Sequence, residues 1–111
     1  MNITELVNVA WQHAEDHGFH EDMSNVVPVK LALIHAEVSE ALEAHRESDI
    51  ITHYTTDPRG RAKPEGLATE LADIIIRVAD LAGILEIDLE GAINQKIAYN
   101  ATRPYKHGKA Y

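Results

Sequence analysis

The 111-residue chain suits one compact domain, and its content of 45% hydrophobic and 25% charged residues is that of a folded protein rather than a disordered one. The absence of cysteine excludes disulfides and thiolate metal sites, and the net charge of −8 argues against binding to a nucleic acid polymer. No apolar run approaches the roughly 20 residues of a membrane span, and the first ten residues carry Glu5 but no Lys or Arg, unlike a signal peptide. We therefore expect a single cytoplasmic domain over residues 1–111 with no membrane partner.

Two helices are predicted in the first half of the chain. The first covers about residues 3–17, with Asn2 as N-cap, Glu5 in the position of a capping box and Gly18 as terminator. The second covers about residues 28–47, because Pro28 suits a first helical turn and apolar residues recur at helical spacing. The apolar residues of this second helix are Leu31, Ile34, Val38, Ala41 and Leu42.

The segment over residues 48–64 interrupts the helical pattern. It holds the Asp57-Pro58 pair, Gly60 and Pro64, which are typical of turns. We expect a long loop here, with at most a short strand over residues 50–54. A loop of this length in a small domain is uncommon unless it is functional or disordered.

Two further helices are predicted in the second half. One covers about residues 65–85, and the other begins after the N-cap Asp88 and ends before Pro104. Ile74, Ile75 and Ile76 make the first of these apolar on more than one side, which indicates burial against a second subunit. The predicted fold class is therefore all-α, a four-helix bundle-like domain that forms a homodimer or homotetramer.

Two pairs of acidic residues lie on the second and third predicted helices. Glu37 and Glu40 are three residues apart, as are Glu70 and Asp73, so each pair lies on one side of its helix. In a chain with 18 acidic residues, a solvated acidic face is the ordinary interpretation of either pair. Both pairs, however, lie at the edge of an apolar stripe. If the helices face each other, four carboxylates converge on an all-oxygen site that suits Mg²⁺ or Mn²⁺.

Four segments carry a resemblance to a known family. They are residues 17–19 (HGF), 30–43 (KLALIHAEVSEALE), 64–77 (PEGLATELADIIIR) and 96–109 (KIAYNATRPYKHGK). The chain is similar in them to the MazG-like, all-α nucleoside triphosphate pyrophosphohydrolases, whose hallmark is a Glu-x-x-Glu pair followed by a Glu-x-x-Asp pair. The 29 residues from 41 to 69 that separate the two pairs are many for this hallmark.

The resemblance implies an activity and a metal site. The activity is Mg²⁺-dependent hydrolysis of a nucleoside triphosphate substrate, with ribose or deoxyribose, to the monophosphate and pyrophosphate, in control of the nucleotide pool. Mn²⁺ is an alternative cofactor. The implied metal ligands are Glu37, Glu40, Glu70 and Asp73. Glu37 or Glu40 would also act in catalysis, by orienting or deprotonating the attacking water.

The resemblance also implies residues that bind the substrate. Lys96, Asn100 and Arg103 are expected near the triphosphate, and their spacing allows them to share one helix face. The other candidates in the matched segments are Lys30, His35 and Tyr105, of which His35 either touches substrate or only packs.

Two alternatives stay open. The first is a non-enzymatic helical module that dimerises and binds a partner through its apolar third helix. The second is a phosphohydrolase that acts on a related phosphoribosyl compound.

Overall fold

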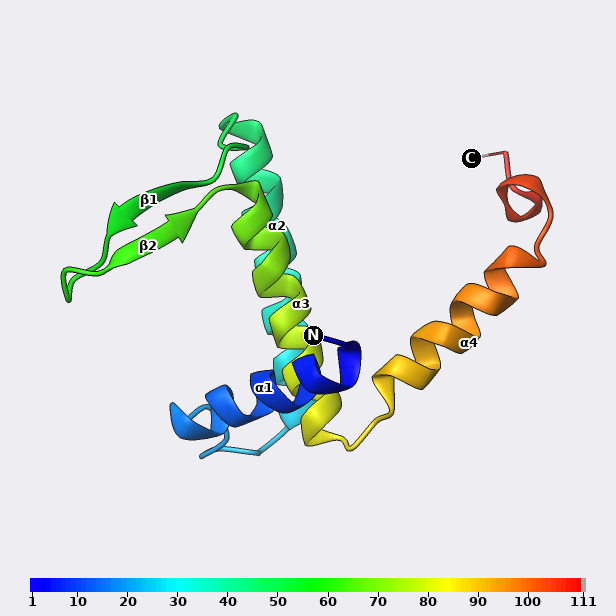
Figure 1. Ribbon diagram of the computed structural model, residues 1–111, viewed down its shortest axis with the longest axis horizontal. Coiled ribbons are helices and arrows are strands. Elements are labelled where there is room, and N and C mark those ends of the chain that lie inside the picture. The colour runs from blue at the N-terminus through cyan, green and yellow to red at the C-terminus, as the bar shows by residue number, and fades with distance from the viewer. Residues whose placement is uncertain (111) are drawn as a thin grey trace.

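The computed structural model describes residues 1–110 and is mostly helical, with four α-helices and a small two-stranded sheet (Figure 1). The elements in chain order are α1 (Ile3–Asp16), α2 (Val26–Arg46), β1 (His53–Thr56), β2 (Ala62–Glu65), α3 (Leu67–Ile84), α4 (Leu89–Ala101) and a 3-10 turn, η1 (Tyr105–Gly108). The four predicted helices are confirmed, with ends that differ from the prediction by at most two residues.

Side-chain caps fix the starts of α1 and α4. The Asn2 side chain accepts the backbone N–H of Glu5 at 2.8 Å, and the Asp88 side chain accepts that of Gly91 at 3.0 Å. Each of these bonds satisfies a donor that the first helical turn leaves without a partner. Glu90 of α4 also accepts the backbone N–H of Ile3 at 3.0 Å, which ties the start of α4 to the start of α1.

The core lies where α1 and α2 pack on α3 (Figure 1). Its buried residues are small, with Val7 and Ala10 from α1 and Ala79 and Ala82 from α3. A Cβ placed on Gly83 would lie only 2.9 Å from the Cβ of a tryptophan of α1, so glycine lets the two helices approach closely. Helices α2 and α3 run antiparallel, and the hairpin joins them at one end (Figure 1).

The prediction of a purely all-α chain with a long loop over residues 48–64 is wrong, because this segment forms an antiparallel hairpin with His53 opposite Glu65 and Thr56 opposite Ala62. The turn explains the pairing: the Asp57 side chain accepts the backbone N–H of Arg59 at 2.9 Å and of Arg61 at 2.8 Å. Gly60 supplies the positive φ that such a turn requires. The turn residues Asp57 and Gly60, which were expected to lie in a loop, therefore connect the two strands of a hairpin.

Helix α4 stands apart from the α2–α3 pair and leads to the C-terminal turn (Figure 1). None of its residues is buried, and Ile97 and Tyr99 are exposed. In a single chain, α4 is therefore not packed as the fourth member of a bundle. Among the helices of residues 1–110, none has the length and apolar character to cross a membrane.

Candidate metal centre

Helix α3 carries a polar stripe along an otherwise apolar helix. Glu70, Asp73, Arg77 and Asp80 follow one another at steps of three, four and three residues, so they lie along one side of α3. Glu37 extends from α2 toward this stripe and accepts a hydrogen bond from Arg77. The antiparallel packing of α2 on α3 thereby brings together groups that are far apart in the sequence.

Three of the carboxylates converge. Glu37, Glu70 and Asp73 each place one oxygen within 4.8 Å of the oxygens of the other two, so the group could hold a metal ion. Glu37 is only 8% exposed, although glutamate is rarely buried without compensation. Its Oε2 atom and the Oε2 atom of Glu70 are buried and have no hydrogen-bond partner within residues 1–110.

The electrostatics of the cluster disfavour full ionisation. The pKa of Asp73 is raised by burial and then by the charge of Glu37, while the Arg77 guanidinium opposes the rise. The pKa of Glu70 is raised by burial and then by the charge of Asp73. A divalent cation would offset both causes, because it neutralises the like charges and supplies a partner for the orphaned oxygens.

Glu40 lies at the exposed edge of the cluster. It is outside the group of three whose oxygens converge. Its pKa is raised, first by hydrogen bonding with Glu37 and then by the Glu37 charge. Such a hydrogen bond requires a proton on one of the two carboxyls, because two ionised carboxylates can only accept.

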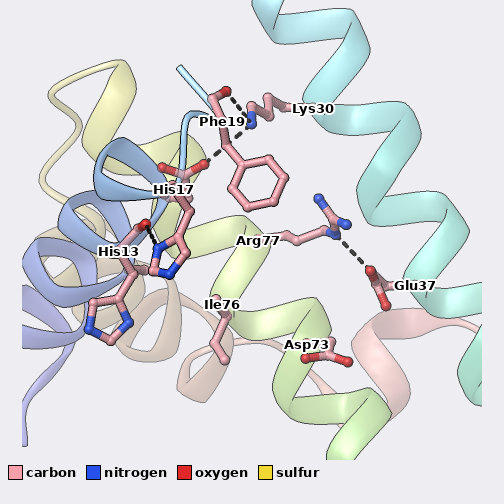
Figure 2. Close-up of a pocket in the computed structure, with 11 residues that line it drawn as sticks. His13, His17, Phe19, Lys30, Glu37, Asp73, Ile76 and Arg77 are labelled. Atoms are coloured by element: carbon pink, nitrogen blue, oxygen red, sulfur yellow. Dashed lines mark hydrogen bonds and ion pairs between the residues drawn. The ribbon is translucent and has the colours of Figure 1, made fainter. Parts of the chain in front are cut away.

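A cavity of about 380 Å³ opens beside these carboxylates (Figure 2). Its volume falls in the range of sites for small ligands, roughly 300–1,000 Å³. It is lined by Ala10, His13, Ala14, His17, Phe19, Lys30, Glu37, Asp73, Ile76, Arg77 and Asp80. The cavity is thus acidic at Glu37 and Asp73, and apolar and aromatic at Ile76 and Phe19.

A second ionic group closes the other side of the cavity. Asp80 is buried, and its Oδ1 lies 2.8 Å from Nε2 of His20, while the other ring nitrogen of His20 lies 2.6 Å from Glu15. The Lys30 ammonium lies 3.5 Å from Oδ2 of Asp80 and donates to the backbone carbonyl of Phe19 at 3.5 Å. These contacts join α1, α2 and α3 and fix Lys30 at the cavity wall.

The residues that the sequence predicted for substrate binding lie in different places. Lys30 lines the cavity, whereas His35 is exposed on α2 and is not among the lining residues. Lys96 and Arg103 lie over the ring of Tyr99 on α4, at 5.0 and 5.6 Å from its centroid. Asn100 and Tyr105 are exposed in the same part of the chain. No residue of α4 or the C-terminal turn lines this cavity.

Arg77 and Asp80 were not predicted as site residues. Both continue the spacing of Glu70 and Asp73 along α3, so a search for polar residues at helical spacing in this apolar helix would have found them. Their partners Glu37 and His20 come from distant parts of the sequence. Those contacts depend on tertiary packing and leave no local pattern.

The chain matches no family among those searched, no curated protein and no solved structure. The assignment of a function therefore depends on the residues and on their geometry.

Proposed function

We propose that the protein is a divalent-metal-dependent hydrolase that converts nucleoside triphosphates to nucleoside monophosphate and pyrophosphate. The observation that carries this proposal is the convergence of Glu37, Glu70 and Asp73 beside the cavity, with two buried carboxylate oxygens that have no partner. A structure stabilised only by its own contacts would not favour such a group, because unpartnered buried carboxylates are costly.

The donor set fits Mg²⁺ or Mn²⁺. All three converging groups are carboxylates, and hard divalent cations bind oxygen ligands. Three negative charges exceed the charge of one ion, but Mg²⁺ commonly binds through one or two carboxylates together with substrate phosphates. A polyphosphate in the adjacent cavity would therefore complete the site.

The chain's own groups suggest a division of roles. When bound, the ion would offset phosphate charge and make a water at the site easier to deprotonate. Glu40 is the better placed of the two candidate bases, because it is exposed at the cluster edge, whereas Glu37 is buried. Glu37 already holds Arg77 through Oε1 at 2.7 Å. The water would attack the α-phosphorus, Glu40 would take its proton, and the bond to the oxygen that bridges to the β-phosphorus would break.

The basic residues of α4 would act on a second copy of the chain. Lys96 and Asn100 lie on α4, and Arg103 follows its end; this helix stands apart from the α2–α3 pair that carries the carboxylates of its own chain (Figure 1). In a homodimer or homotetramer, α4 could reach the cavity of a partner subunit, where Lys96 and Arg103 would offset charge on the departing pyrophosphate. The biological role would be the removal of unwanted nucleotides from the pool.

One observation favours a second candidate function. The exposed apolar residues on α2, α3 and α4 would suit a non-enzymatic module that dimerises and binds a partner. This module would have no need of the orphaned carboxylate oxygens beside a cavity, so we rank it second. It predicts no turnover that depends on Mg²⁺.

The test is a product assay on the full chain. A panel of nucleoside and deoxynucleoside triphosphates would be incubated with Mg²⁺, and the products separated by anion exchange. We expect monophosphate and pyrophosphate in equal amounts, without diphosphate. Diphosphate and inorganic phosphate as primary products would rule out attack at the α-phosphorus. Phosphoribosyl compounds in the same panel would identify the related phosphohydrolase, if they alone are cleaved.

A further inference from the structure

Arg77 lies between the carboxylate cluster and the cavity. It follows three isoleucines on α3, and its Nε donates to Glu37 Oε1 at 2.7 Å. The Arg77 side chain is 36% exposed, whereas that of Glu37 is 11% exposed. The ion pair therefore has a buried acidic side and an accessible basic side.

The guanidinium group has donors to spare. Arginine carries five N–H donors in a planar fork, and within residues 1–110 only the Nε donor of Arg77 has a hydrogen-bond partner. Figure 2 shows the group in the cavity between Glu37 and Phe19. The other long basic side chain of the lining, Lys30, is 11% exposed and already occupied by Asp80. Arg77 is thus the basic group that is better able to accept a new anionic partner.

A cation at the cluster would weaken the ion pair. Glu37 Oε2 is the unpartnered oxygen, so a metal ion and the guanidinium would approach one carboxylate from two sides. The metal ion and the guanidinium are both positive, so they repel each other when they share one carboxylate. This repulsion is strongest where water is largely excluded. A polyphosphate in the cavity would instead attract both of them.

We propose that Arg77 is a displaceable counter-ion that becomes a phosphate-binding residue. Without metal, it neutralises Glu37. When a divalent cation occupies Glu37, Glu70 and Asp73, the guanidinium turns to the phosphate oxygens of the substrate. This inference rests on the proposed function, because it requires a metal at the cluster and a polyphosphate in the cavity.

The inference predicts two opposite effects of one substitution. Arg77→Met keeps much of the side-chain length and removes the charge. Binding of Mn²⁺ alone should become tighter by a factor of about three or more, because the competitor for Glu37 is gone. Binding of magnesium tripolyphosphate should weaken by roughly tenfold or more, because a charge-assisted contact is lost. Both affinities can be measured by calorimetry, without turnover.

A matched control removes the same charge elsewhere. Arg46 is exposed at the end of α2 and does not line the cavity. Arg46→Met should leave both affinities within about twofold of the parent, since exposed charges separated by more than a Debye length are largely screened. If Arg77→Met and Arg46→Met change the two affinities equally, the effect is one of net charge and the inference is overturned.

The remaining outcomes separate this inference from the proposed function. If the parent binds Mn²⁺ but Arg77→Met leaves both affinities unchanged or weakens both, Arg77 is structural and only the inference fails. If the parent binds no Mn²⁺, the proposed function fails and the inference fails with it. Should Arg77→Met not fold, Arg77→Lys replaces it: the lysine keeps the charge but lacks the planar fork. That variant should bind Mn²⁺ as the parent does and tripolyphosphate more weakly, and equal tripolyphosphate affinity would overturn the inference.

Discussion

Glu37, Glu70 and Asp73 hold like charges close together in a partly buried place. Burial raises the pKa of both Asp73 and Glu70, and the neighbouring carboxylates raise each of them further. In the metal-free protein the native state therefore holds protons on this cluster that the unfolded chain would already have released. The free energy of unfolding must depend on pH for this reason.

The sign of this dependence follows from the direction of the shifts. Below the ordinary carboxyl pKa of roughly 4, these carboxyls are protonated in both the native and the unfolded state, so the cluster does not lower the free energy of unfolding. As pH rises above that value, the unfolded chain ionises first, so the cluster lowers the stability of the native state until its own raised pKa values are passed. Denaturant unfolding in EDTA should show the parent losing stability relative to Asp73→Asn as pH rises above about 4.

The difference in stability between the parent and Asp73→Asn cancels the contributions of groups that titrate in the same way in both proteins. Asp22, whose pKa is lowered by hydrogen bonds from Ser24, contributes the opposite slope but is present in both proteins. A stability difference between parent and Asp73→Asn that does not change with pH would contradict the raised pKa of Asp73.

At the scale of the elements, α3 organises the site because it carries the polar stripe and packs against both α1 and α2. Its start is fixed by Gly66, which has φ 113° and ψ 171°, a region that is essentially restricted to glycine. A Cβ on Gly66 would lie 2.7 Å from the backbone oxygen of Ile51. Glycine at this position therefore sets where the hairpin ends and the ligand-bearing helix begins.

Replacement of this glycine should be costly. Gly66→Ala is expected to lower the free energy of unfolding by about 1–3 kcal/mol or more, through backbone strain and the clash with Ile51. Gly60→Ala is the matched control, because Gly60 also has a positive φ but no atom lies within 4 Å of the added Cβ. Chemical denaturation of both variants measures the difference. An equal loss in the two variants would show that the contact with Ile51 does not constrain the fold.

The sequence predicted the elements better than their arrangement. Helical spacing and the caps Asn2 and Asp88 are local signals, and the four helices were predicted from them. The hairpin was missed because its strands are exposed and short, with no alternation of apolar and polar residues. The hairpin is defined instead by its turn, where the Asp57 side chain accepts hydrogen bonds from the backbone N–H groups of Arg59 and Arg61.

The candidate site was also predictable only in part. Spacing indicated the acidic pairs, and three of the four carboxylates do converge. No local pattern could show that Arg77 pairs with Glu37, because the two residues are brought together by the packing of α2 on α3. The sequence also could not show where Lys96 on α4 and Arg103 just after it lie relative to these carboxylates, because α4 stands apart from the α2–α3 pair instead of packing as a fourth bundle helix.

The whole molecule is more open than a monomer of its size should be. Its radius of gyration is 16.7 Å, whereas a compact domain of this length has about 13 Å. Its accessible surface is 8356 Å², roughly 2,300 Å² more than a folded monomer of this mass exposes. That excess is of the order that each subunit of an obligate dimer buries. We therefore propose that the chain self-associates through α4 and the exposed sides of α2 and α3.

Self-association can be tested on α4 by sedimentation. We expect a homodimer or homotetramer for the parent. Ile97 is 62% exposed in the single chain, and Ile97→Asp should dissociate the assembly and reduce turnover. Asn94→Asp adds the same charge at a polar, exposed position of α4 and should leave the assembly intact. A parent that is a stable and active monomer would contradict this proposal.

The central claim is that Glu37, Glu70 and Asp73 form a metal site rather than a solvated acidic surface, and thermal melts with and without Mg²⁺ test it most directly. The parent should gain about 2.7 kcal/mol at a hundredfold excess of Mg²⁺ over its dissociation constant. Glu70→Gln and Asp73→Asn should match or exceed the parent's stability in EDTA and gain much less from Mg²⁺. Glu43→Gln, an exposed position on α2 outside the cluster, should respond as the parent does. Equal stabilisation of the parent and of all three variants by Mg²⁺ would contradict the metal site.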